Sequence, residues 1–69
     1  MKMEMMQHGF DEKYPFILKL FNQSRNQMIE VRKWLRQSKI EYKINEGVVY
    51  IYVHLTSEID VLSFKLRWQ

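Results

Sequence analysis

The first apolar stretch of the chain predicts a β-strand over residues 14–21. This stretch is short and rich in aromatic residues, and a polar cluster follows it, as is common for strands. Pro15 lies at its start, where a strand tolerates the missing backbone N–H best. Because strand side chains alternate between two faces, Ile17, Lys19 and Phe21 share one face and the even-numbered residues share the other.

A polar start and a 3.6-residue period predict an α-helix over residues 24–38. Ser24 with Gln27 three residues later is a capping-box pattern, which is typical of a helix N-terminus. Apolar residues then recur at helical spacing and indicate one buried face. The residues of this face are Met28, Val31 and Leu35, with Trp34 beside them.

The sequence after the helix predicts two further strands that form a hairpin. Residues 40–44 alternate apolar and polar residues, which is typical of a half-exposed strand. The Asn45-Glu46-Gly47 segment predicts a tight turn, in which Gly47 would supply a positive φ. Residues 48–55 predict the strongest strand, with the odd-numbered side chains from Val49 to Leu55 beneath the helices. Tyr50, Tyr52 and His54 then face the opposite way.

Residues 57–68 fit both a helix and a strand. Ser57 followed by Asp60 three residues later is typical of a helix start. From Leu62 onward, however, apolar and polar residues alternate, which is the period of a strand. We favour the helix because start chemistry is a local mechanism. As a helix, the segment has two apolar stripes and needs contacts on two sides: Ile59, Leu62 and Leu66 form one, and Val61, Phe64 and Trp68 form the other.

The predicted order strand-helix-strand-strand-helix indicates an α+β fold. We expect a two-layer sandwich, with both helices on one face of a three-stranded mixed sheet. The strand-helix-strand connection predicts a right-handed crossover between parallel strands, as in a ferredoxin-type split unit without its last strand. Residues 14–69 are expected to form this single domain. Residues 1–13, which are rich in methionine, are expected to form a flexible N-terminal arm.

Composition supports a small folded domain without catalytic chemistry. The 69 residues include no cysteine, which excludes a disulfide framework and a thiolate zinc site. His8 and His54 do not lie at metal-ligand spacing, and the two glycines form no phosphate-binding loop. We therefore expect no enzyme activity, no cofactor and no metal. No apolar run approaches the roughly 18 residues of a membrane span, so we expect no membrane association and a cytoplasmic location.

The aromatic face of the predicted sheet is the leading candidate site. The net charge of +3 permits an acidic partner, and tyrosine is enriched at protein interfaces. The face would suit a protein partner, a second copy in a homodimer, or single-stranded nucleic acid stacked on its rings. It would equally arise if strands simply favour tyrosine and the methionine-rich arm covers this side. Its residues are Lys19, Phe21, Lys43, Tyr50, Tyr52 and His54.

The basic side of the helix over residues 24–38 is the second candidate. Charge on the water side of an amphipathic helix usually serves solvation alone. The same charges would also suit an acidic protein groove or a phosphate backbone, whose binding would weaken as salt increases. The basic residues are Arg25, Arg32, Lys33, Arg36 and Lys39.

The C-terminal sequence, Asp60-Val61-Leu62-Ser63-Phe64-Lys65-Leu66-Arg67-Trp68, resembles a pattern at the C-terminus of small accessory proteins of T-even-type tailed phages. In that pattern an acidic helix start precedes Phe-Lys-Leu-Arg and an aromatic residue; the glycine that often follows is missing here. The resemblance implies a small early protein, made in the bacterial cytoplasm, that binds and redirects a host protein. We therefore expect a non-catalytic binding protein that modulates a host protein or self-associates through the aromatic face. Single-stranded RNA binding is the alternative.

Overall fold

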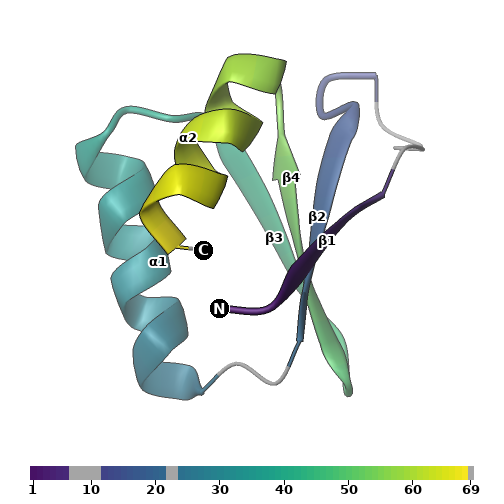
Figure 1. The fold of residues 1–69 in the computed structure, drawn as a ribbon, viewed down its shortest axis with the longest axis vertical. Coiled ribbons are helices and arrows are strands. Elements are labelled where there is room, and N and C mark those ends of the chain that lie inside the picture. Colours follow the sequence, from purple (N-terminus) through teal and green to yellow (C-terminus); the bar gives the residue numbers. More distant parts are fainter. Residues whose placement is uncertain (7–11, 22–23, 69) are drawn as a thin grey trace.

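Residues 1–6, 12–21 and 24–68 are described in a computed structural model of the chain. They form two layers: a β-sheet, and two helices that cover one of its faces (Figure 1). The α+β class expected from the sequence is therefore confirmed. The elements in chain order are β1 (Met3–Met6), β2 (Phe16–Phe21), α1 (Arg25–Gln37), β3 (Tyr42–Glu46), β4 (Tyr50–Leu55) and α2 (Glu58–Trp68).

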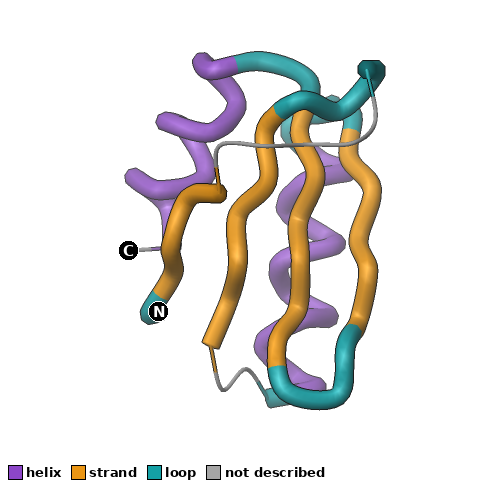
Figure 2. The backbone as a smooth tube through the Cα atoms, turned by 90° about the vertical axis from the view of Figure 1, so that its right-hand side faces the viewer, coloured by secondary structure: helices purple, strands orange, loops and turns teal. Residues whose placement is uncertain are grey.

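The sheet has four strands in the order β1-β2-β4-β3, and every neighbouring pair is antiparallel. Strand β4 lies between β2 and β3 (Figure 2), so the crossover through α1 joins parallel strands that are not neighbours. The predictions of three strands and of a mixed sheet are thus both wrong. The Val53 and Leu55 side chains of β4 are fully buried, and a central position gives this strand a hydrogen-bonded neighbour on each side.

The additional strand comes from the segment that we expected to be a flexible arm. In β1, Met3 lies opposite Leu20 and Met5 lies opposite Leu18. This edge position beside β2 is the one that the last strand of a ferredoxin-type unit would occupy. The N-terminus and the C-terminal end of α2 lie near each other in both views (Figures 1 and 2), which lets an N-terminal strand fill that position. Residues 7–11 of the predicted arm lie outside the described residues.

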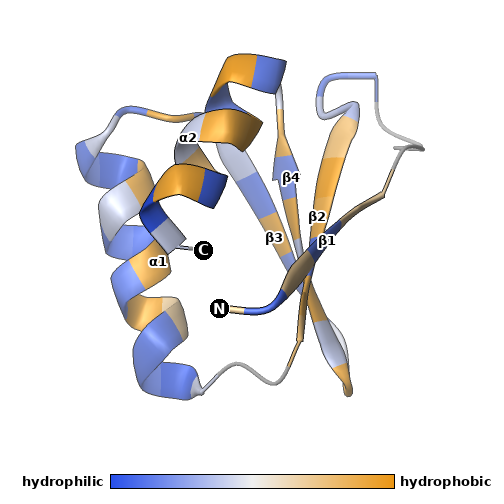
Figure 3. Cartoon of the chain, viewed as in Figure 1, coloured by the Kyte–Doolittle hydropathy of each residue, from blue (hydrophilic) through white to orange (hydrophobic). Residues whose placement is uncertain are grey.

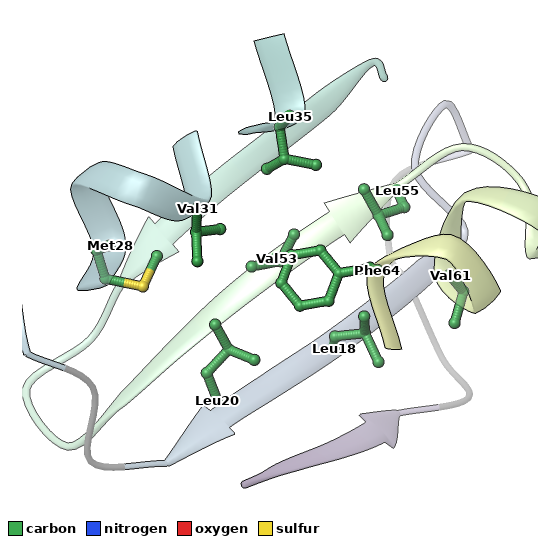
Figure 4. Close-up of a cluster of buried hydrophobic side chains, with 9 residues drawn as sticks. All are labelled: Leu18, Leu20, Met28, Val31, Leu35, Val53, Leu55, Val61 and Phe64. Atoms are coloured by element: carbon green, nitrogen blue, oxygen red, sulfur yellow. The ribbon is translucent and has the colours of Figure 1, made fainter. Parts of the chain in front are cut away.

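The core lies between the helices and the inner face of the sheet (Figure 4). The core contains residues that the sequence predicted on the apolar faces of β2, β4 and α1. Each of these core residues is at most 3% exposed. These side chains interlock without a buried polar or charged residue among the described residues. The core residues are Leu18, Leu20, Met28, Val31, Leu35, Val53, Leu55, Val61 and Phe64.

Both helices begin at the serine caps that the sequence predicted. The Oγ atom of Ser24 accepts a hydrogen bond from the Gln27 backbone N–H at 3.1 Å. The Oγ atom of Ser57 accepts one from the Asp60 backbone N–H at 3.2 Å. Each cap satisfies a backbone donor that the first turn of a helix cannot pair. The helical interpretation of the C-terminal segment is therefore confirmed.

Helix α1 ends in a turn that places Lys39 in the left-handed region, with φ of 56°. The Lys39 N–H donates to the Arg36 carbonyl, and the Ile40 N–H donates to the Leu35 carbonyl at 3.0 Å. This pair of bonds is a Schellman motif, whose left-handed position is usually glycine. A side chain other than glycine is strained there, because its Cβ approaches the backbone too closely.

Replacing Lys39 with glycine is expected to raise the free energy of unfolding by about 0.5 to 1 kcal/mol. Glycine removes the left-handed strain, and the gain is reduced because glycine is more flexible in the unfolded chain. Equilibrium urea unfolding would measure the difference. Lys39→Ala is the matched control, since it removes the charge but keeps the Cβ; a glycine variant no more stable than the alanine variant would contradict the strained conformation.

The β3–β4 turn differs from the prediction in position and in the role of its glycine. Strand β3 extends to Glu46, so Val48 and Val49 form the tip. Val49, predicted to face the core, is therefore 65% exposed. No described glycine has a positive φ. Gly47 instead permits a close approach: its N–H donates to the Tyr50 carbonyl at 2.8 Å, and an added Cβ would lie 2.8 Å from that same oxygen.

Candidate protein-binding face of the sheet

The sheet face opposite the helices collects all six residues of the predicted aromatic face. Cross-strand register places Phe21 opposite Tyr50, and Lys19 opposite Tyr52. Lys43 lies opposite His54 on the other side of β4. Directly opposed residues in an antiparallel pair point to the same side. The residues hereafter called the aromatic face are Lys19, Phe21, Lys43, Tyr50, Tyr52 and His54, and Figure 2 looks onto the sheet from this side.

Lysines stack on the aromatic rings at one end of this face. The rings of Phe21 and Tyr50 meet edge to face, with centroids 5.1 Å apart and an interplanar angle of 77°. The Lys19 Nζ lies 3.9 Å from the Tyr50 centroid and 5.3 Å from the Phe21 centroid. The Lys2 Nζ lies 5.4 Å from the Phe21 centroid. Because an ammonium is attracted to the negative face of a ring, these contacts hold positive charge directly on the apolar surface.

The other end of the aromatic face centres on His54. Its Nε2 atom lies 3.1 Å from the Asn45 Nδ2 atom of β3, and its ring nitrogen Nδ1 is buried. Ile17 lies opposite His54 on β2 and is only 6% exposed, although it points away from the helices. The side chain of His54 is thus held in place by neighbouring strands, as a preformed binding surface requires.

Positive charge predominates on this side of the sheet. The ammonium groups of Lys2 and Lys19 lie over its rings, and Glu4 lies opposite Lys19 in the register. Glu41 immediately precedes β3. Its Oε1 atom forms an ion pair with the Lys13 Nζ at 2.8 Å. The hydrogen bond and charge of Glu41 raise the pKa of Lys13 above its ordinary value of 10.5, so the Lys13 ammonium stays charged at physiological pH.

The predicted basic residues of α1 lie in the other layer, because the helices cover the opposite face of the sheet (Figure 1). Arg32 also reaches across to β3, where its Nη2 lies 3.1 Å from the Glu46 Oε1. The structure therefore does not bring the basic residues together with the aromatic face, and one short ligand cannot contact both at once. The basic residues are Arg25, Arg32, Lys33, Arg36 and Lys39, of which all but Arg32 are exposed.

Sequence reasoning missed an open groove between α1 and the β3–β4 turn. It has a volume of about 520 Å³, and its walls include the apolar side chains of Met28, Ile29 and Ile51. Arg32 and Glu46, which form an ion pair, also line the groove. The groove arises where a helix turn faces a hairpin end, a juxtaposition that no local sequence signal predicts.

Within residues 1–6, 12–21 and 24–68, no group of three or more His, Asp or Glu side chains is placed to hold a metal ion. In the same part of the chain, neither helix has the length and apolar character needed to cross a lipid bilayer. Comparison with known protein families, curated proteins and solved structures found no match to this chain.

Proposed function

We propose that this chain is a small non-catalytic binding protein that docks the aromatic face onto an acidic surface of a partner protein. The single observation that carries the proposal is the Phe21, Tyr50 and Lys19 cluster on the side of the sheet that faces away from the helices. Half-buried aromatic rings beside cations are the side chains that contribute most to binding at protein interfaces. The C-terminal resemblance to phage accessory proteins suggests a bacterial host protein as the partner.

Rigidity supports this choice of surface. The aromatic face stands on β2 and β4, the two central strands, which pair with each other over the full length of both. Lys19 already lies against its rings before a partner arrives. Little side-chain freedom would then be lost on docking, which favours affinity. A partner carboxylate could approach the Lys19 ammonium while an apolar group covers the neighbouring ring edge.

Changing Tyr50 and Tyr52 together to serine is expected to weaken partner binding by at least about 30-fold, since the loss of even one anchor of this kind costs about 2 kcal/mol or more. The tagged full chain would be used to capture proteins from a nuclease-treated bacterial host lysate, and the affinity of a captured protein would then be measured with purified components. Ile29→Ser is the matched control, because Ile29 is exposed on α1, in the other layer.

Circular dichroism and thermal unfolding of the double variant would establish that it folds. A folded Tyr50→Ser/Tyr52→Ser variant that binds the captured protein as tightly as the original chain would overturn the assignment of this surface. An unchanged Ile29→Ser variant beside a weakened double variant supports it.

Single-stranded nucleic acid is the second candidate ligand. The favouring observation is that aromatic side chains stand on both central strands of a four-stranded sheet, which is how some RNA-binding domains stack bases. Against it, Lys19 lies over the ring of Tyr50, and the basic residues of α1 lie in the other layer. Omitting the nuclease distinguishes the ligands: a partner captured only without nuclease treatment would favour nucleic acid.

A further inference from the structure

Helix α2 exposes a stripe of large apolar side chains that no described part of the chain covers. Ile59 is 75% exposed, Leu62 is 54% exposed and Leu66 is 86% exposed. They recur at helical spacing on one side of the helix, whereas Val61 and Phe64 on the opposite side are fully or nearly fully buried. Figure 3 shows the contrast with α1, whose outer side is mostly hydrophilic. A contiguous exposed apolar stripe usually marks an interaction site.

The spacing of this stripe matches itself when a second α2 is laid antiparallel against it. Ile59 lies three residues before Leu62, and Leu66 lies four residues after it. With a two-fold axis near Leu62, each Leu62 meets its counterpart in the partner, and each Ile59 meets Leu66 of the partner subunit. A two-fold interface requires just this property, because the same patch must be complementary to itself.

Charge on the flank of the stripe is compatible with the same antiparallel pairing, to within one residue. Glu58 and Lys65 lie on one flank of the helix, four residues before Leu62 and three residues after it. In the antiparallel pair, Glu58 would therefore approach Lys65 of the partner subunit, twice per dimer. Acidic residues at a helix start and basic ones at its end are common, because they suit the helix dipole. What the dipole does not require is that both residues lie on one flank of the helix, on either side of Leu62 and within one residue of equal distance from it.

We propose that the chain forms a two-fold homodimer through antiparallel pairing of α2, with Ile59, Leu62 and Leu66 as the apolar contact and Glu58–Lys65 pairs at its rim. A helix of 11 residues is only about 16 Å long, so the interface is small. The dimer is accordingly expected to be weak and transient, as interfaces below about 1,200 Å² often are. The pairing leaves the aromatic face free, since that face belongs to the other side of the sheet.

Sedimentation velocity of the full chain over a hundredfold range of concentration, from about 5 to about 500 µM, would reveal a weak dimer. The mass is expected to rise with concentration from 8.6 kDa to twice that value. Leu62→Glu is expected to weaken the dimer by at least about tenfold, because two carboxylates would meet at the axis. Ile29→Glu is the matched control: Ile29 on α1 is 53% exposed, almost the same as Leu62, and its replacement should leave the dimer unchanged.

A mixing experiment tests the register itself. Glu58→Lys makes the flank entirely basic, and Lys65→Glu makes it entirely acidic, so each variant alone should self-associate more weakly, by about three- to tenfold. An equal mixture of the two variants should regain dimers of original strength, since each pair again joins opposite charges. Thermal unfolding of each variant at low concentration verifies that α2 is intact. Recovery of the dimer in the mixture is a second control, because two damaged helices would not regain the original strength of association when mixed.

Three results would each overturn the proposal. The first is a mass of one chain at every concentration. The second is a dimer that Leu62→Glu leaves intact, and the third is a dimer that only Tyr50→Ser/Tyr52→Ser disrupts, because that would place the contact on the aromatic face. The first two results do not bear on the binding of an acidic partner protein to the aromatic face, which is measured separately.

Discussion

Replacing Phe64 with alanine is expected to lower the free energy of unfolding by about 3 to 5 kcal/mol, as for other buried phenylalanines. Phe64 is fully buried and joins α2 to both α1 and the sheet. Its ring packs edge to face against Trp34, with centroids 6.0 Å apart, and lies 6.4 Å from the ring of Trp68. A domain of this size is stabilised by only about 3 to 10 kcal/mol in total, so the variant should be largely unfolded at moderate urea concentrations.

Equilibrium urea unfolding followed by circular dichroism would measure this loss. Leu66→Ala is the matched control on the same helix, because Leu66 is 86% exposed; its cost at low protein concentration should stay within about 0.5 kcal/mol. The comparison also discriminates between the two sequence interpretations of residues 57–68. In a strand, Phe64 and Leu66 would share a face and their replacement would cost similar amounts, so equal losses would contradict the helix.

Replacing Met3 and Met5 together with serine is expected to lower the free energy of unfolding by about 2 to 3 kcal/mol, the cost of removing two partly buried methionines from the core edge. Both side chains pack against the core cluster, opposite Leu20 and Leu18 of β2. The backbone N–H of Phe21 also donates to the Lys2 carbonyl at 3.1 Å. Loosening β1 would thus expose the hydrogen-bonding edge of β2 as well as its apolar face.

Amide hydrogen exchange and urea unfolding would together follow this change. The double variant should lose protection along the β1-facing edge of β2, and it should unfold at lower urea concentration. Glu4→Ser is the control, since Glu4 lies between the two methionines but is exposed. If the double variant were as stable as the Glu4→Ser variant, β1 would contribute nothing to the sheet, and the flexible arm expected from the sequence would be the better description.

Much of the aromatic face was predictable, because strand alternation is a local rule. Once β4 is recognised, its pleat sends Tyr50, Tyr52 and His54 to one side, and β2 adds Lys19 and Phe21 by the same rule. The contacts within the face were not predictable. The approach of Lys19 to the Tyr50 ring depends on which residues of β2 and β4 are neighbours, and this register is fixed by pairing between segments far apart in the chain.

Local sequence signals were enough to predict α1, the serine caps of both helices and the buried sides of β2 and α1. Each of these follows from residues within a few positions of one another: Ser24 reaches Gln27, Ser57 reaches Asp60, and a 3.6-residue period selects the buried stripe of α1. Interactions of this range are present whatever the rest of the chain does, so pattern and cap chemistry suffice to predict them.

Contacts between distant parts of the chain, in contrast, set the place of β1, the insertion of β4 between β2 and β3, and the exposure of one apolar stripe on α2. Met3–Met6 has no strong strand pattern of its own, and it is ordered because β2 offers an unpaired edge and an uncovered apolar surface. The same reasoning applies to α2: its two stripes are alike in the sequence, and only the single sheet face available for packing determines that Val61 and Phe64 are buried while Leu62 and Leu66 remain outside.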